Sequence, residues 1–194
     1  GLHLPFWVIL PLGAGLAALF GVLLGTPTLR LRGDYLAIVT LGFGEIIRIF
    51  MNNLNAPVNI TNGPQGINLI DPASLGSFSF SQSHTLFGYT FTGVHLTYYL
   101  FLLFTVAVVF ISMRLEDSRI GRAWVAIRED EIAAAATGIN TRNLKLLAFA
   151  MGATFGGLAG GLFASFQGFI SPESFNLMES IMILCMIVLG GMGH

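Results

Sequence analysis

Charged residues are scarce in this sequence. Of its 194 residues, 10% are charged and 54% are hydrophobic, and the mean hydropathy is +0.77. Soluble domains carry about 25% charged residues. A soluble protein of this size could not cover its surface with so few, so the composition indicates a membrane protein.

Other absences exclude further classes of function. Cys185 is the single cysteine and lies in an apolar run, which leaves neither a disulfide framework nor the cysteine spacing of a metal site. The net charge is −1 and no basic tract is present, so we expect no nucleic-acid partner. The sequence also lacks a His/Asp/Glu cluster with metal spacing, a nucleophile elbow and a Walker sequence. We therefore expect no catalytic residue, no metal and no cofactor bound by this chain.

Long apolar stretches fill most of the chain. A transmembrane helix needs about 20 mostly apolar residues, and about five stretches qualify. The second and fifth are short, so a tilted, broken or partly re-entrant path stays open for both. The sequence predicts an all-α fold, a polytopic transmembrane helical bundle that forms a single domain over residues 1–194. We also expect the domain to be truncated at both ends. The predicted spans cover residues 4–25, 35–51, 94–113, 146–170 and 177–189.

Basic residues orient these spans. Alternating through five spans places eight of the nine Lys and Arg side chains on one side, and the positive-inside rule makes that side the cytoplasm. The segments 52–93 and 171–176 carry no Lys or Arg. We therefore expect a multi-pass plasma-membrane protein with an external loop at 52–93, which forms either a short hairpin or an irregular connector, and a cytoplasmic loop at 114–145. The eight cations are Arg30, Arg32, Arg114, Arg119, Arg122, Arg128, Arg142 and Lys145.

The cytoplasmic loop predicts a short helix of its own. Good helix formers run from residue 122 to residue 137, and Gly138 is a natural residue to end the helix. Asn140 or Thr141 can cap the helix that follows. Either an ordinary interfacial helix or a docking helix for a partner fits this pattern. The candidate docking residues are Arg122, Arg128, Glu129, Asp130, Glu131, Ala133, Ala134 and Gly138.

Several long motifs resemble one family. GDYLAIVTLGFGEIIRI from Gly33, NGPQGI from Asn62 and GRAWVAIREDEI from Gly121 are similar to the M-type permease subunit of branched-chain amino acid ABC importers, as are SPESF from Ser171 and VLGGMG from Val188. The resemblance covers most of the chain. It implies a bacterial inner-membrane permease without enzymatic activity.

The resemblance also implies partners. These are a homologous permease subunit, two cytoplasmic ATPase subunits that bind ATP and Mg, and a periplasmic or lipid-anchored substrate-binding protein. The loop at 114–145 is then the coupling loop that docks into an ATPase. Its sequence departs from the family's Glu-Ala-Ala pattern, because Ile132 stands between Glu131 and Ala133.

Glycines recur at four-residue spacing in the fourth predicted span. Two such ridges let a neighbouring backbone come close. The interpretation is tight helix packing, with movement during gating as a possible consequence. The ridges are Gly152, Gly156 and Gly160, with Gly157 and Gly161 beside them.

Glu45 and Arg48 lie within the second apolar stretch. Their spacing of three places them on one helix face. Charges in a membrane are costly unless they are paired or face protein or water. They either reach the external interface or line the translocation path or its junction with the partner permease. Gly42 and Gly44 just before them could loosen the helix.

Two other classes of transporter stay open beside the leading one. A related urea or short-chain amide ABC permease shares the general pattern. In an ion-coupled secondary transporter, Glu45 would carry a proton or an ion. The loop at 114–145 separates them, because a secondary transporter needs no docking helix.

Overall fold

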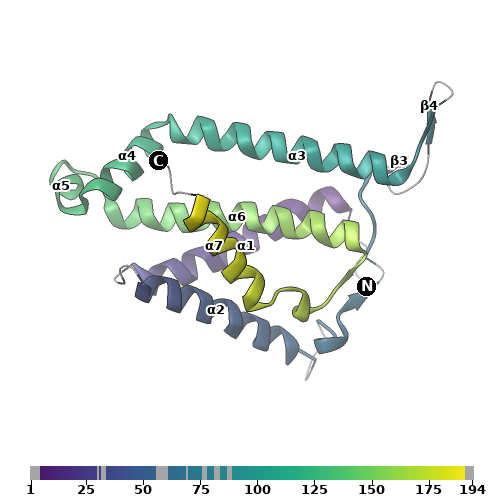
Figure 1. Ribbon diagram of the computed structural model, residues 1–194, viewed down its shortest axis with the longest axis horizontal. Helices are drawn as coiled ribbons and strands as arrows, with labels where there is room; N and C mark the ends of the chain where they lie inside the picture. Colours follow the sequence, from purple (N-terminus) through teal and green to yellow (C-terminus); the bar gives the residue numbers. More distant parts are fainter. Residues whose placement is uncertain are drawn as a thin grey trace. The chain divides into compact units, whose positions relative to one another are not determined.

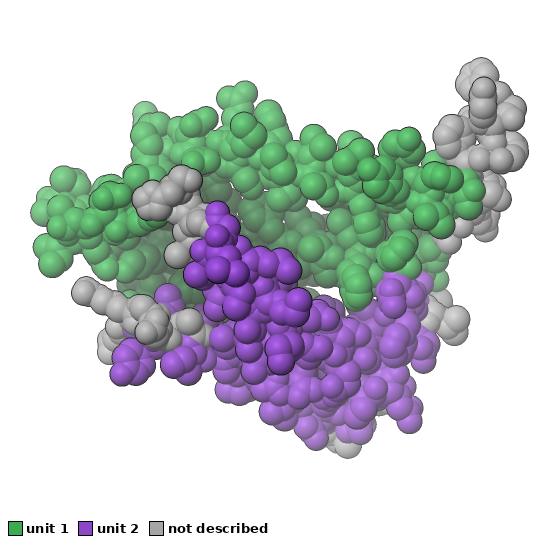
Figure 2. All heavy atoms as spheres, viewed as in Figure 1, with its two compact units in different colours: residues 1–29, 71–166 green, residues 30–70, 167–194 purple. Residues whose placement is uncertain are grey.

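Long helices make up most of the computed structural model (Figure 1). The structure describes residues 5–29, 31, 34–55, 61–68, 70–75, 78–80, 84–86 and 89–190. Its strands are two or three residues long, so the predicted all-α fold is confirmed. The chain forms two compact units, which Figure 2 colours separately. Unit 1 holds residues 1–29 and 71–166, and unit 2 holds residues 30–70 and 167–194.

Unit 1 is built on three long helices. These are α1 (Phe6–Thr28), α3 (Gly93–Glu116) and α6 (Thr141–Gln167), with the short helices α4 (Arg119–Glu129) and α5 (Glu131–Ala136) between the last two. Two small antiparallel hairpins precede α3 and include the short hairpin that the sequence predicts for the external loop. They pair β2 (Ser74–Leu75) with β3 (Phe78–Ser79) and β4 (His84–Leu86) with β5 (Tyr89–Phe91).

The core of unit 1 lies near the N-terminal end of α1. Phe6 and Leu10 of α1 are buried against Ala73 and Leu100. The Trp7 Nε1–H donates to the carbonyl oxygen of Ser74 at 3.0 Å, which attaches the start of β2 to α1. Burial of apolar side chains and this hydrogen bond therefore hold the helices together at that end.

Unit 2 combines two helices with a short connecting sheet. It holds α2 (Asp34–Asn52), the 3₁₀ helix η1 (Gly63–Gln65), β1 (Ile67–Asn68), β6 (Phe169–Ile170), the 3₁₀ helix η2 (Pro172–Ser174) and α7 (Leu177–Gly190). β1 and β6 pair antiparallel, with Ile67 opposite Ile170. Gly66 has a positive φ of 70°, and a Cβ there would collide with the carbonyl group of Ile170. Glycine therefore allows the segment after η1 to approach β6 closely.

Four stretches of the described chain are long and apolar enough to cross a membrane: Phe6–Thr28, Gly93–Glu116, Thr141–Gln167 and Pro172–Gly190. They correspond to the first, third, fourth and fifth predicted spans. The second predicted span forms the helix α2, which is not among these four. Much of the apolar surface of these helices is exposed, as expected where lipid or other helices cover it.

The prediction of one helix over residues 122–137 was wrong in its continuity. The helix is broken at Asp130, whose backbone is extended (φ −152°, ψ 110°). The Asp130 carboxylate accepts hydrogen bonds from the backbone N–H groups of Ile132 and Ala133 at 2.8 and 3.0 Å. An aspartate that caps a new helix thus competes with continuation of the old one. The predicted end is present, because Gly138 follows α5 with a φ of 86°.

Candidate functional site

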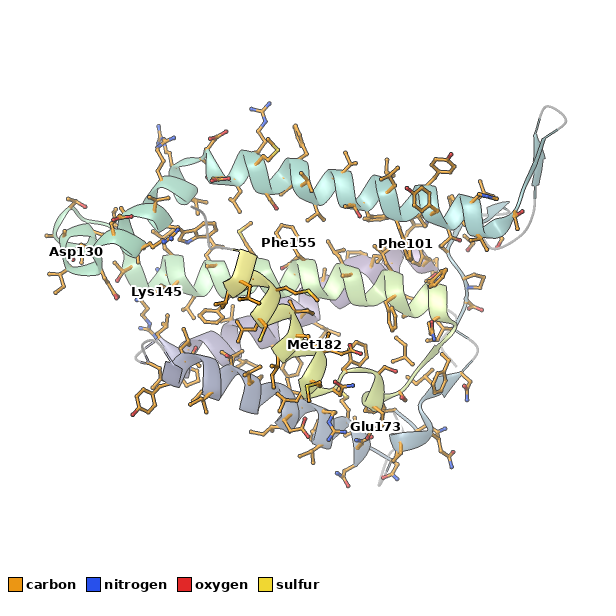
Figure 3. All side chains as sticks on the ribbon, in the orientation of Figure 1. Phe101, Asp130, Lys145, Phe155, Glu173 and Met182 are labelled. Atoms are coloured by element: carbon orange, nitrogen blue, oxygen red, sulfur yellow. The ribbon has the colours of Figure 1, made fainter. Side chains whose placement is uncertain are left out.

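Three charged side chains meet in unit 2. Glu45 and Arg48 share one face of α2. Glu173, which Figure 3 labels, belongs to η2 in the turn before α7. The Arg48 Nε donates to both oxygens of Glu45 at 3.1 and 3.0 Å. The Arg48 Nη1 donates to both oxygens of Glu173 at 2.9 Å. We call Glu45, Arg48 and Glu173 the charged cluster.

Each nitrogen of the Arg48 guanidinium donates to a carboxylate of this cluster. Its third nitrogen, Nη2, also donates to Glu45, at 2.5 Å. All three nitrogens therefore face carboxylates, and the side chain is only 22% exposed. The cluster holds two carboxylates and one guanidinium, so one negative charge is left over if both acids are ionised. Arg48 therefore already balances one of the two negative charges of the cluster.

The sequence did not predict Glu173 as a partner of Arg48. The two residues are 125 positions apart, and no periodic pattern connects them. The predicted topology contained a usable signal, because it placed Glu173 in an external turn and Arg48 near the external end of the second span. Asn52 joins the cluster by donating from Nδ2 to Glu173 at 3.0 Å.

Two cavities adjoin the charged cluster, each of about 300 Å³. Gly44 and Phe175 line both. The first, here called the apolar cavity, is also lined by Ile47, Met51, Ile67 and Ile170, with Arg48 among its remaining residues. The second, here called the acidic cavity, is also lined by Glu45, Glu179, Asn176 and Thr40. A ligand with one apolar end and one polar end fits this pair of environments.

The glycine at the junction leaves these cavities open. A Cβ on Gly44 would meet no described atom within 4 Å, and the same holds for Gly42. Gly42 lines neither cavity. Of the two glycines that the sequence singled out in α2, only Gly44 is therefore part of the hollow region.

The predicted coupling loop is attached firmly to α6 in unit 1. The Trp124 Nε1–H donates to the carbonyl oxygen of Leu144 at 2.8 Å. The Lys145 Nζ lies 2.7 Å from a carboxylate oxygen of Glu131, and Figure 3 labels Lys145 on α6 opposite the α4–α5 turn at Asp130. These contacts connect α4 and α5 to the start of the long helix α6.

The remaining loop residues divide by exposure. Ala134 is buried against the loop itself, at 4% exposure, whereas Ile132 is 77% exposed. Arg122, Arg128, Glu129, Asp130 and Ala133 are exposed as well, and Glu131 is half-buried. The loop thus presents an isoleucine and several charges together to its surroundings.

The two glycine ridges of α6 have different environments. A Cβ on Gly157 would lie 2.7 Å from the Cβ of Ala17 and 2.8 Å from the carbonyl oxygen of Gly13, both on α1. A Cβ on Gly161 would lie 2.9 Å from Leu10. Among the described residues, no atom lies within 4 Å of a Cβ placed on Gly152, Gly156 or Gly160. One ridge packs on α1, and the other is uncovered in unit 1.

In the described part of the chain, no group of three or more His, Cys, Asp or Glu side chains could hold a metal ion. The side chains of the charged cluster form ion pairs with one another, as do Glu131 and Lys145.

The long, apolar and largely exposed helices define a multi-pass helical membrane protein. Comparison with known families identifies it further. The model of the family described as "Branched-chain amino acid transport system / permease component" matches residues 2–194, so the chain belongs to this family. The resemblance noted in the sequence is thereby confirmed.

Named relatives fall into two groups. The chain is 48% identical over 202 residues to the high-affinity branched-chain amino acid transport system permease protein LivM of Escherichia coli, covering 98% of this chain and 47% of that protein. The probable branched-chain amino acid transport permease protein LivM of Methanocaldococcus jannaschii is 29% identical over 192 residues, which is 96% of this chain and 51% of the relative. The permease protein LivH of Salmonella typhimurium is 35% identical over 88 residues, which is 45% of this chain and 28% of the relative.

The chain therefore spans about half the length of the LivM proteins it matches. These relatives are transport permeases by name, in agreement with the prediction that the chain is not an enzyme. No solved structure matches the chain.

Proposed function

We propose that the full protein is a transmembrane permease subunit of an ATP-driven importer for branched-chain amino acids. Membership of the permease family and the similarity to LivM over nearly the whole chain support the substrate class. The four apolar stretches support a location in the membrane. The bacterial inner membrane is the proposed site, with the loop at 114–145 in the cytoplasm and the loop at 52–93 outside.

The geometry of α4 and α5 is the observation that carries the coupling role. An ATP-driven permease needs a rigid cytoplasmic element to which its ATPase can bind. The hydrogen bond from Trp124 and the ion pair between Glu131 and Lys145 hold α4 and α5 on α6, while Ile132 stays exposed. In this proposal, Ile132 and the neighbouring charges contact an ATPase subunit, and α6 carries the movement into the membrane.

The proposed assembly contains three further kinds of subunit. A homologous permease pairs with this one, and the similarity to LivH as well as LivM supports a pair of related permeases. Two ATPase subunits bind ATP and Mg, and an external binding protein delivers the amino acid. The uncovered ridge of Gly152, Gly156 and Gly160 is proposed to pack against a helix outside unit 1.

The charged cluster is proposed to lie at the outer end of the translocation path. Under the proposed orientation, the C-terminal half of α2 and the start of α7 both face the outside. The cluster joins α2 to η2, the turn just before α7, through Arg48 and Glu173. Its charges are mutually paired, which lowers the cost of placing them near lipid.

The test is uptake of radiolabelled leucine by proteoliposomes. The full-length subunit is reconstituted with its co-expressed partner subunits. Uptake is measured with and without the binding protein, and with and without ATP on the side of the membrane that carries the ATPase subunits. Uptake that requires both ATP and the binding protein is the expected result. Assembly with an active ATPase but uptake of urea or amides in place of leucine would contradict the substrate, and failure to bind any ATPase would contradict the coupling role.

A further inference from the structure

The two cavities of unit 2 share walls but differ in chemistry. Gly44 and Phe175 line both of them. The apolar cavity is closed by Ile47, Met51, Ile67 and Ile170, whereas the acidic cavity contains Glu45 and Glu179. Because small-molecule sites occupy about 300–1,000 Å³, a cavity of this size suits a small ligand.

The balance of charge selects a cationic group at the polar end. Arg48 is the one basic side chain that lines either cavity in the described chain, and all its nitrogens already donate to carboxylates. Glu179 is exposed and makes no side-chain hydrogen bond or ion pair with the described residues. An ammonium group can therefore find an open carboxylate here, whereas the one cation at the cavities is already bound to carboxylates.

We propose that the two cavities form one binding site for an aliphatic α-amino acid. The branched side chain enters the apolar cavity, and the α-ammonium lies in the acidic cavity beside Glu179 and Glu45. This inference rests on the proposed function for the nature of the cargo, and it adds that the site recognises the ammonium end and the alkyl end. The α-carboxylate of the bound ligand stays directed toward water.

Gly44 has a defined role in this site. Because it lacks a side chain, the alkyl and ammonium ends of one ligand can reach both cavities past the α2 backbone. A Cβ at this position would meet no atom of a neighbouring element within 4 Å, and the two cavities that Gly44 lines offer room for the rest of a Leu side chain. The substitution would therefore fill the junction without forcing apart the helices of unit 2.

The experiment is saturation-transfer NMR on the full-length complex in nanodiscs without the binding protein. The probes are leucine, 3-methylbutylamine, which lacks the carboxylate, and 4-methylpentanoate, which lacks the ammonium. Leucine and the amine are expected to bind with similar affinity. The carboxylate compound is expected to bind at least about tenfold more weakly, since it loses a charge-assisted contact and meets two acids.

Two variants locate the signal. Gly44→Leu is expected to abolish the saturation-transfer signal of leucine. Gly15→Leu, a matched change on an open face of α1, is expected to leave this signal intact. Glu179→Gln is nearly isosteric and is expected to weaken the binding of leucine and of the amine by roughly tenfold. Glu116→Gln, which removes an exposed acid at the end of α3, leaves binding unchanged. If Gly44→Leu prevents assembly, Glu179→Gln decides the matter.

Two results overturn the inference. One is equal binding of 4-methylpentanoate and leucine, and the other is wild-type leucine binding in both Gly44→Leu and Glu179→Gln. The uptake assay keeps this test separate from the proposed function. Normal ATP-dependent leucine uptake together with either result rejects the site alone, whereas absence of any leucine uptake by the wild-type complex rejects the importer proposal.

Discussion

Units 1 and 2 are held together in different ways. In unit 1, α1 and α6 meet at glycines so closely that a Cβ on Gly21 would lie 2.6 Å from the Cβ of Ala153. In unit 2, α2 and the start of α7 leave two cavities of about 300 Å³, and ion pairs cross from α2 to η2. Unit 1 has no spare room at its glycine interface, whereas unit 2 is hollow and charged.

This contrast separates two tasks that a permease must combine. A tightly packed helix pair transmits displacement because packed interfaces resist compression. A cavity between elements joined by exposed ion pairs can admit a ligand and release it. The proposed coupling loop belongs to unit 1, which holds the packed α1–α6 pair, and the candidate binding site belongs to unit 2. Steric changes are therefore expected to harm unit 1 most, and charge changes unit 2.

A steric change at the α1–α6 interface is expected to have the largest effect. Gly157→Leu would drive a side chain into Ala17 and the backbone of Gly13, and overpacking of this kind costs on the order of 1–3 kcal/mol or more. The yield and thermal unfolding midpoint of the purified complex measure the loss.

The neighbouring ridge supplies the matched control. Gly156→Leu adds the same side chain where no described atom lies within 4 Å, so the subunit is expected to keep its fold. A loss confined to pairing with the second permease would mark this ridge as an intermolecular contact. Equal destabilisation by both variants would contradict the assignment of Gly157 to the packed side.

Removing the positive charge of Arg48 in unit 2 is expected to have the second-largest effect. Arg48→Met leaves Glu45 and Glu173 facing each other without a positive charge, so assembly or transport is expected to fail. Glu45→Ala is expected to impair assembly or transport less than Arg48→Met does, because Glu173 still pairs with Arg48. Leucine uptake normalised to assembled complex tests the order. Wild-type uptake and yield in Arg48→Met would show that the cluster is dispensable.

A change on the exposed face of α5 comes third. Ile132→Asp places a charge where contact with an ATPase is proposed, and the amount of ATPase that co-purifies is expected to fall severalfold. Ile132→Leu keeps the apolar contact and serves as the control. Since Ile132 is 77% exposed, the unfolding midpoint is expected to stay unchanged. Retention of the ATPase by the aspartate variant would argue against this docking surface.

A charge change in the packed unit is expected to matter least. Lys145→Met removes the ion pair with Glu131, whose partners are 29% and 37% exposed. Such surface pairs contribute about 0.2–1 kcal/mol, and the Trp124 hydrogen bond still holds the loop. Denaturation of the complex in increasing urea, compared with Arg48→Met, tests this. A larger loss than in Arg48→Met would reverse the proposed contrast between the units.

Local sequence pattern accounts for the helices but only for part of the candidate site. Apolar runs predicted every long helix, and the spacing of Glu45 and Arg48 predicted their shared face. The i,i+4 pattern also marked both glycine ridges of α6. It could not say that Gly157 is covered and Gly156 is not, because both ridges have the same spacing and differ only in what packs on them.

Long-range contacts explain what the sequence left hidden. Glu173 reaches Arg48 through the return of the chain along β6 and η2, and Glu179 enters the acidic cavity for the same reason. The break at Asp130 was more accessible to prediction, since an aspartate before Glu-Ile-Ala is a good helix cap. The helix propensity of the residues around Asp130 predicted one continuous helix, but the hydrogen bonds of the Asp130 side chain stabilise the start of a second helix instead.

The most direct measurement is ATP-driven leucine uptake by the Gly44→Leu complex, normalised to assembled complex and to its ATPase activity. Our account predicts normal assembly and retained ATP hydrolysis with uptake lost, because the change fills the hollow unit and spares the packed one. Leucine uptake at the wild-type rate by the assembled complex would contradict it.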